Sequence, residues 1–232
     1  MKLHYSSLLL ILACAFTTRF TYAQNNQITI EFMGNCGLYM TDGTTNFYID
    51  FPYKSGAHGY MEFDDAELDS ITQDAIFIYT HKHADHYSKK NLKSVMKTKG
   101  GQHFGVHNIK ALEKLGETIP GFEIKAFKTK HKIFGIPFRH YSYLITWHGK
   151  RIFLSGDTTD PEVISSTKNI DVAFVPYWIL QYAKEEEKEI DAQMYYIYHL
   201  YPQQVPSAKE TWGPVENMQP LVTPGEKITV AF

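Results

Sequence analysis

The chain has 232 residues, of which 44% are hydrophobic and 15% aromatic, so it can bury one sizeable core and is neither a mini-protein nor a disordered tail. Its 23 Lys and Arg against 25 Asp and Glu give a formal net charge of −2. No basic surplus is present to neutralise a phosphate backbone, so we expect no nucleic-acid partner.

The first 23 residues have the pattern of a secretory signal peptide. Lys2 precedes an apolar run over 8–16, and small residues end the segment before Gln24. The apolar run is too short to cross a membrane as a helix. We therefore expect residues 1–23 to be removed and the product to be exported, either periplasmic or secreted.

A lipid anchor is an alternative to free export. Residues 11–14 end in Cys14 and resemble a lipoprotein signal, in which lipid on this cysteine would attach the protein to a membrane. We expect a membrane contact only in that case. The other cysteine, Cys36, lies between glycines and reads as a small buried side chain.

Residues 24–232 show no internal repeat and are expected to form a single domain. In its first half, strands are predicted over 28–32, 47–51 and 75–79, and an amphipathic helix over 88–99 that ends at Gly100 and Gly101. The first two strands read as antiparallel and the third as fully buried. A short strand at 104–106 and a short helix at 108–115 follow.

The second half begins with a strand over 123–128. His148 and Gly149 mark a hairpin turn between strands 141–147 and 151–154, and 172–175 is another buried strand. We place 192–199 on or after a helix. Strands paired along the chain with helices between them predict an α/β protein with mixed sheets and outer helices.

The strongest chemical signal follows the buried strand at 75–79. His81, His83, Asp85 and His86 lie within six positions. Residues two apart in an extended loop point the same way, so His81 and His83 can share one ion while Asp85 and His86 face a second. Imidazole and carboxylate without thiolate suit Zn²⁺, with Mn²⁺ or Fe²⁺ as alternatives. The competing interpretation is a helix-capping aspartate among solvated histidines.

Further ligands are expected at the ends of other strands. Asp157 follows strand 151–154 and can bridge two cations, although an aspartate here can also cap a turn. His131 follows strand 123–128 and is preferred as the third histidine of the first site, with His140 as the alternative. His199 can complete the second site or can simply pack among its aromatic neighbours.

This order of residues resembles the metallo-β-lactamase superfamily of hydrolases. The pattern that carries the likeness is His81-x-His83-x-Asp85-His86, then a histidine, then Gly156-Asp157-Thr158, then a late histidine. Residues 224–230 resemble the closing strand of its lactonase-like branch. The resemblance implies an αββα sandwich of two mixed β-sheets with the metals at one sheet edge.

Two positions separate branches within that superfamily. β-Lactamases carry Cys or Ser near the position of Asp157, whereas lactonases and phosphodiesterases use a bridging aspartate, so antibiotic hydrolysis is disfavoured. The flavodiiron branch usually carries Glu where this chain has His83, which favours a hydrolytic site.

The function expected is that of an exported di-zinc hydrolase. A metal-bound hydroxide would cleave an ester, lactone or phosphoester of a small molecule, with Asp85 relaying a proton. Tyr177 and Trp178, after strand 172–175, could line the pocket mouth or belong to the core. The alternatives are a mononuclear-iron oxidoreductase of the same superfamily and a metal-binding protein whose catalysis has lapsed. No protein partner is inferred.

Overall fold

The computed structural model describes residues 26–56, 60–133, 135–211 and 216–232. The predicted signal peptide (1–23) and Cys14 lie outside these residues. Within them, no helix is both long enough and apolar enough to span a bilayer.

The first β-sheet gathers six strands, mostly from the N-terminal part of the chain. Its spatial order is β14-β1-β2-β3-β4-β5, antiparallel from β14 to β3 and parallel from β3 to β5. The strands are β1 (Gln27–Gly34), β2 (Gly37–Thr41), β3 (Asn46–Ile49), β4 (Ile76–Ile78), β5 (Gln102–Phe104) and β14 (Lys227–Ala231).

The second sheet is also mixed, with the order β13-β12-β11-β10-β9-β6. The four strands from β13 to β10 run parallel, and β9 and β6 are antiparallel to their neighbours. These are β6 (Phe122–Thr129), β9 (His140–Trp147), β10 (Lys150–Leu154), β11 (Ile170–Pro176), β12 (Ala192–Tyr198) and β13 (Met218–Pro220). A small hairpin, β7 (Lys132–Ile133) with β8 (Ile136–Pro137), projects from the end of β6.

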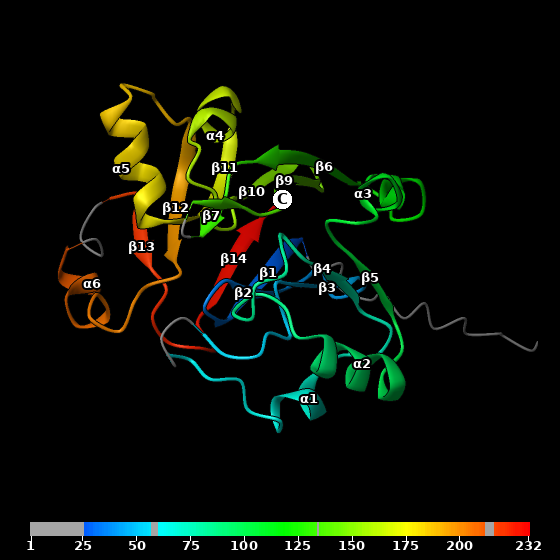
Figure 1. The fold of residues 1–232 in the computed structure, drawn as a ribbon. Helices are drawn as coiled ribbons and strands as arrows, with labels where there is room; N and C mark the ends of the chain where they lie inside the picture. Colours follow the sequence, from blue (N-terminus) through cyan, green and yellow to red (C-terminus); the bar gives the residue numbers. More distant parts are fainter. Residues whose placement is uncertain (1–25, 57–59, 134, 212–215) are drawn as a thin grey trace, which may run out of the picture.

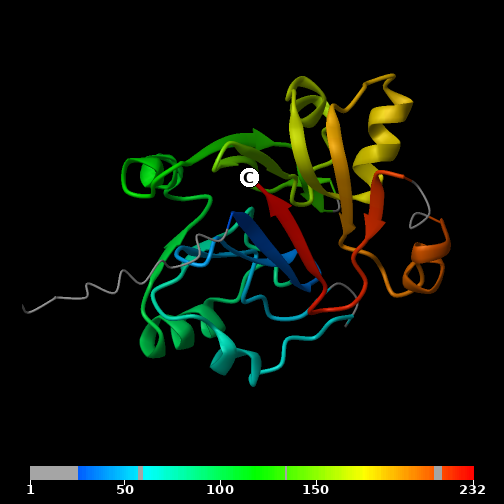
Figure 2. The same ribbon diagram turned by 180° about the vertical axis from the view of Figure 1, so that it is seen from behind.

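Helices lie on the outside of both sheets (Figures 1 and 2). Leu92 and Val95 of α2 pack with Tyr48 and Phe77 on the outer face of the first sheet. Ile179 of α5 packs against the outer face of the second. The helices are α1 (Glu67–Ser70), α2 (Lys89–Thr98), α3 (Ile109–Leu112), α4 (Glu162–Ser166), α5 (Tyr177–Glu185) and α6 (Val205–Thr211), with a 3₁₀ turn at Glu113–Glu117.

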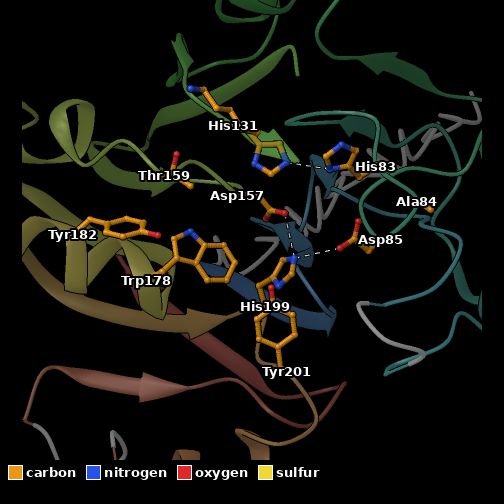
Figure 3. Close-up of a pocket in the computed structure, with 11 residues that line it drawn as sticks. His83, Ala84, Asp85, His131, Asp157, Thr159, Trp178, Tyr182, His199 and Tyr201 are labelled. Atoms are coloured by element: carbon orange, nitrogen blue, oxygen red, sulfur yellow. Dashed lines mark hydrogen bonds and ion pairs between the residues drawn. The ribbon is translucent and has the colours of Figure 1, made fainter. Parts of the chain in front are cut away.

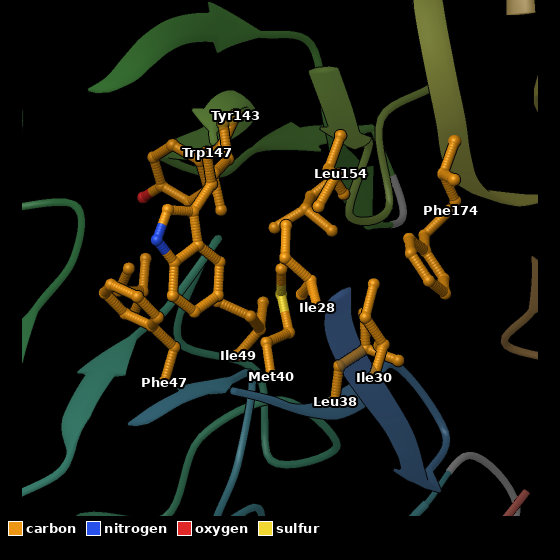
Figure 4. Close-up of a cluster of buried hydrophobic side chains, with 14 of the residues drawn as sticks. Ile28, Ile30, Leu38, Met40, Phe47, Ile49, Tyr143, Trp147, Leu154 and Phe174 are labelled. Atoms are coloured by element: carbon orange, nitrogen blue, oxygen red, sulfur yellow. The ribbon is translucent and has the colours of Figure 1, made fainter. Parts of the chain in front are cut away.

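The main core lies between the inner faces of the two sheets, as Figure 4 shows. Strand β1 alternates buried and half-buried residues along its length, as a strand with one face on the core must. The ring of Phe47 from the first sheet meets Trp147 from the second edge-on, with centroids 5.1 Å apart. Such a pair contributes about 0.5–1.5 kcal/mol beyond the burial of its area. The predicted α/β fold of two mixed sheets with outer helices is confirmed.

Local sequence accounts for how several of these elements begin and end. The Ser88 hydroxyl accepts a hydrogen bond from the backbone N–H of Asn91 at 3.2 Å and so caps α2. His148 and Gly149 both have positive φ in the turn that joins β9 to β10, as expected for a tight hairpin.

Two sequence predictions of elements need correction. Residues 192–198 form strand β12, not a helix, because Met194 to Tyr198 pair in parallel with the buried β11 and extend its hydrogen bonding. Strand β2 at 37–41 was not predicted at all. It pairs with both β1 and β3, so 28–32 and 47–49 are not direct neighbours in the sheet.

Candidate metal centre

The seven predicted ligands gather where strands of both sheets end. His81, His83, Asp85 and His86 occupy the loop between β4 and α2, which belongs to the first sheet. The other three follow strands of the second sheet: His131 after β6, Asp157 after β10 and His199 after β12. Figure 3 shows His83, His131, Asp157 and His199 converging on one cavity, with Asp85 at its edge.

One set of donor atoms comes from His81, His83, His131 and Asp157. All four ligand atoms lie within 4.8 Å of one another. His83 Nδ1 lies 2.8 Å from His81 Nε2 and 3.1 Å from His131 Nε2. Three ring nitrogens therefore point at one small volume, which is the arrangement that a cation held by three histidines needs. We call this the first donor set.

A second set lies on the other side of the Asp157 carboxylate. His86 Nε2 is 3.1 Å from Asp157 Oδ1, and His199 Nε2 is 3.2 Å from both Asp157 Oδ2 and Asp85 Oδ2. The thiol of Cys36 also belongs here, since the ligand atoms of Cys36, His86, Asp157 and His199 lie within 4.8 Å of one another. We call these residues, with Asp85, the second donor set.

Asp157 is the residue common to both sets. It follows Gly156, whose φ of +56° and crowded surroundings admit no side chain: an added Cβ would stand 2.5 Å from His140 Nε2. The backbone N–H of Asp157 donates to that same nitrogen at 2.9 Å. His140 Nδ1 lies 2.7 Å from the Thr129 hydroxyl. The structure therefore places His131 in the first donor set and His140 behind Asp157, with both ring nitrogens engaged elsewhere.

Asp50 lies outside the two donor sets and holds the ring of His86, a member of the second set. Its carboxylate lies 2.8 Å from His86 Nδ1 and accepts hydrogen bonds from the backbone N–H and hydroxyl of Thr80 at 2.7 and 2.6 Å. A carboxylate on the far nitrogen fixes the ring orientation of a metal-binding histidine and leaves Nε2 facing the ion.

Burial and neighbouring charge lower the pKa of some histidines in the site and raise that of others. Burial, and after it the neighbouring His86, lower the pKa of His81, while burial and His131 lower that of His83. These rings are neutral at pH 7, with a lone pair available. Burial also lowers the pKa of His199, but the facing carboxylates of Asp157 and Asp85 outweigh it and raise the value to about 9.

The same two effects set the pKa values of Asp157 and Cys36. Burial raises the pKa of Asp157, but His199 and His86 lower it more, so the bridging carboxylate is ionised. Burial, reinforced by Asp157, Asp50 and Asp85, raises the pKa of the Cys36 thiol.

Buried polar atoms without partners support a cation in the second donor set. Among the described residues, five ring nitrogens on four of the predicted ligands are buried and make no hydrogen bond: His83 Nε2, His86 Nε2, His131 Nδ1, and both nitrogens of His199. His86 Nε2 and His199 Nε2 come within 3.2 Å of carboxylate oxygens, yet they do not point at them in hydrogen-bonding geometry. Unpaired buried polar groups are costly, and a divalent ion in the second set would satisfy His86 Nε2 and His199 Nε2. In the first set the support is different: the nitrogens that face one another there are His81 Nε2, His83 Nδ1 and His131 Nε2, and their convergence suits a shared cation.

A cavity of about 670 Å³ opens onto both donor sets. Trp178 lines it, and its indole N–H donates to the carbonyl of Thr158 at 2.9 Å. Tyr182 and Tyr201 line the same wall (Figure 3). Tyr177 does not line the cavity and packs instead against the cluster under α5.

Sequence reasoning overlooked four residues that shape this site. Asp50 directly follows strand β3, and an acidic residue at a strand end was an available signal. Cys36 was interpreted only as a buried apolar residue; it is fully buried, but beside Asp157. Tyr182 and Tyr201 gave no signal, because their approach to the cavity depends on how α5 and the segment after β12 pack.

Comparison with known proteins agrees with the fold. Residues 29–193 match the family model described as "Beta-lactamase superfamily domain". No curated protein sequence matches the chain.

Three solved structures share the fold at low sequence identity. A protein from Parabacteroides distasonis assigned as a metal-dependent hydrolase is 21% identical with a TM-score of 0.59, over 84% of this chain and 91% of that one. Igni18, a metallo hydrolase from Ignicoccus hospitalis, is 18% identical with a TM-score of 0.62, over 89% and 99%. CmlA, a diiron β-hydroxylase from Streptomyces venezuelae, is 13% identical with a TM-score of 0.50, over 88% and 54%.

The match to the family model covers most of the chain. It runs from β1 into β12 and includes every predicted ligand except His199. The chain thus belongs to the metallo-β-lactamase superfamily, as the motif at His81–His86 predicted.

Proposed function

We propose that the protein is a two-metal hydrolase that cleaves an ester, lactone or phosphoester of a small molecule, with zinc as its metal. The observation that carries the proposal is the sharing of Asp157 between two donor sets. Three ring nitrogens converge in the first set, and two buried ring nitrogens of the second set have no hydrogen-bond partner. Two divalent cations there would polarise a carbonyl or phosphoryl oxygen and lower the pKa of a water molecule. Donor sets rich in imidazole and carboxylate suit zinc, with Mn²⁺ or Fe²⁺ as alternatives.

The chain's own residues have separate tasks in this proposal. Asp157 spans the two sets, held in place by the His140 ring behind its backbone. Asp85 lines the cavity beside His199, so its Oδ2 can take up a proton and pass it to the leaving oxygen. Trp178, Tyr182 and Tyr201 offer an apolar wall for the rest of the substrate.

Metal analysis tests the proposal and separates it from the alternatives. We expect two zinc ions per purified chain by elemental mass spectrometry, as in other two-metal sites. Asp157→Ala should lose both metal and turnover, whereas His103→Ala, a change of an exposed histidine outside the donor sets, should retain both. One iron per chain would instead support the oxidoreductase, and a metal-free chain would support lapsed catalysis.

Assays on a panel of substrates identify the class of bond that the protein cleaves. Purified protein tested on lactones, phosphodiesters and β-lactams is expected to turn over one of the first two classes and to leave β-lactams intact. Hydrolysis of β-lactams alone would contradict the inference drawn from the bridging aspartate.

We also propose that the protein is exported. The signal pattern in residues 1–23 supports this. N-terminal sequencing of protein recovered from the host should begin at Gln24. A lipidated N-terminus at Cys14 would mean membrane anchoring, and an intact Met1 would contradict export.

A further inference from the structure

The turn between β1 and β2 touches both segments that supply the second donor set. Strand β1 ends at Gly34, β2 begins at Gly37, and Asn35 and Cys36 form the turn between them. The Asn35 side-chain amide donates to the backbone carbonyl of Asp85 at 2.7 Å, and its backbone carbonyl accepts from the N–H of His199 at 3.0 Å. The turn is therefore bonded to the loop after β4 and to the end of β12.

Close packing keeps this turn in place. An added Cβ on Gly34, which has a φ of +109°, would stand 2.5 Å from the Tyr53 hydroxyl oxygen. The Asn35 side chain is only 2% exposed, so it cannot exchange its hydrogen bond to Asp85 for water without moving the turn. The position of the next residue, Cys36, is consequently fixed relative to the donor sets.

The thiol of Cys36 faces the Asp157 carboxylate from the side of the second set. Its Sγ is fully buried, 3.8 Å from Asp157 Oδ1. An independent observation marks the same volume as a ligand site: His86 Nε2 and His199 Nε2 are buried there without a hydrogen-bond partner. Sulfur, two imidazole nitrogens and a carboxylate oxygen thus surround one point, with all four ligand atoms within 4.8 Å of one another.

We propose that Cys36 is a sulfur ligand of the metal in the second donor set. The inference rests on the proposed two-metal site. As the metal–sulfur bond forms, the thiol proton passes to solvent and the thiolate binds the ion. Asp85 is partly exposed and lines the cavity beside this set.

A thiolate changes which metals the second set prefers. Sulfur with two imidazoles favours zinc and cobalt over manganese, which prefers oxygen ligands. The first donor set has no sulfur, so the two sets should differ in metal preference within one chain.

Cobalt substitution tests the inference without measuring activity. Full-length protein carrying Cys14→Ala retains Cys36 as its only thiol. After the metal is removed and Co²⁺ is added, we expect an intense sulfur-to-cobalt charge-transfer band in the near ultraviolet. The matched variant Cys14→Ala/Cys36→Ser should lose the band. Its affinity for the second cobalt should fall by at least the roughly 10–100-fold that loss of an outer-shell partner costs.

Cobalt stoichiometry, measured on the same samples, separates the two proposals. Two cobalt ions with no sulfur band would overturn the role of Cys36 and leave the two-metal site intact. One cobalt with a band that disappears in Cys36→Ser would uphold the sulfur ligand and overturn the two-metal site. One cobalt without a band, or no cobalt, would overturn both. The band in the Cys14→Ala protein decides the question even if Cys36→Ser fails to fold.

Discussion

His131 and His140 show how one residue type takes two different roles in the same site. His131 Nε2 points into the first donor set, 3.1 Å from His83 Nδ1. His140 accepts the backbone N–H of Asp157 instead, and burial lowers its pKa to about 3, so the ring is neutral and its Nε2 lone pair can accept. The first is placed as a ligand and the second as a positioning residue.

Alanine variants of these two histidines should therefore behave differently. His131→Ala removes a ligand and should reduce the metal content by one ion per chain. His140→Ala should retain both metals and bind them about 10–100-fold more weakly, because the Asp157 backbone loses its partner. Titration with a competing chelator measures both effects. Equal metal loss in the two variants would contradict this division of roles.

At this scale the sequence pointed to the residues that gather in the two donor sets but not to those that hold them in place. His81, His83, Asp85 and His86 stand out because they are close in the sequence. Asp50 and Cys36 come from turns of the first sheet, distant along the chain from the residues that they contact. Their roles depend on pairing between strands, which a single sequence does not encode as a local pattern.

At the scale of elements, the turn after β10 positions the bridging carboxylate. Gly156 has a φ of +56°, and its N–H donates to the Tyr198 hydroxyl at 2.8 Å. An added Cβ would meet His140 Nε2 at 2.5 Å and Thr80 Cβ at 2.9 Å. The turn can bring Asp157 this close to both sheets only with glycine before it.

Two glycine variants separate backbone strain from crowding. Gly149 also has a positive φ, +79°, but an added Cβ there would meet nothing within 4 Å. Gly149→Ala should therefore introduce backbone strain alone and lower the free energy of unfolding by about 1 kcal/mol. Gly156→Ala should introduce the same strain and also overpack its surroundings, which should lower the free energy of unfolding by a further amount of about 1–3 kcal/mol. Urea unfolding of both variants measures the difference, and equal losses would show that crowding at Gly156 has no consequence.

The error at β12 has a physical origin. Strand β12 reads as Met194-Tyr195-Tyr196-Ile197-Tyr198, a run of large side chains that lacks a clean period of two. Its extended form is stabilised by parallel pairing with β11 across the intervening helix α5, a contact that no local pattern in the sequence specifies. The hairpin of β9 and β10 was predicted because its turn residues specify it locally. The hairpins that β2 forms with β1 and β3 were missed.

At the scale of the whole molecule, a hydrogen bond between Asp42 and His148 joins the two sheets at an edge of the core. Asp42, after β2, lies 2.8 Å from His148 Nε2 in the β9–β10 turn. The ring of Phe232 stacks on His148, with centroids 4.1 Å apart. Burial raises the pKa of Asp42, but hydrogen bonds from the Thr45 N–H and His148 outweigh it, so the value is lowered from 3.8.

This contact should make stability depend on pH in a defined direction. Because the pKa of Asp42 is lower in the folded state, its contribution is present above about pH 4 and is lost as the pH falls through the folded-state value. Asp42→Asn should be less stable than the wild type by no more than about 1 kcal/mol at pH 7, since the pair is partly exposed. The difference should shrink towards pH 3.

Urea unfolding at several pH values measures the effect. Asp65→Asn, a change of an exposed aspartate, serves as the control and should match the wild type throughout. A deficit in Asp42→Asn that stays constant down to pH 3 would show that the charge of Asp42 does not stabilise the fold.

The distribution of the donor sets along the chain also fixes the order in which the centre can be assembled during synthesis. The first set is complete in sequence once Asp157 has emerged, whereas the second also needs His199, directly after β12. In the proposed two-metal site, the residues for one ion are thus synthesised before those for the other. A product shortened before residue 199 would keep the residues of the first set and lack a ligand of the second.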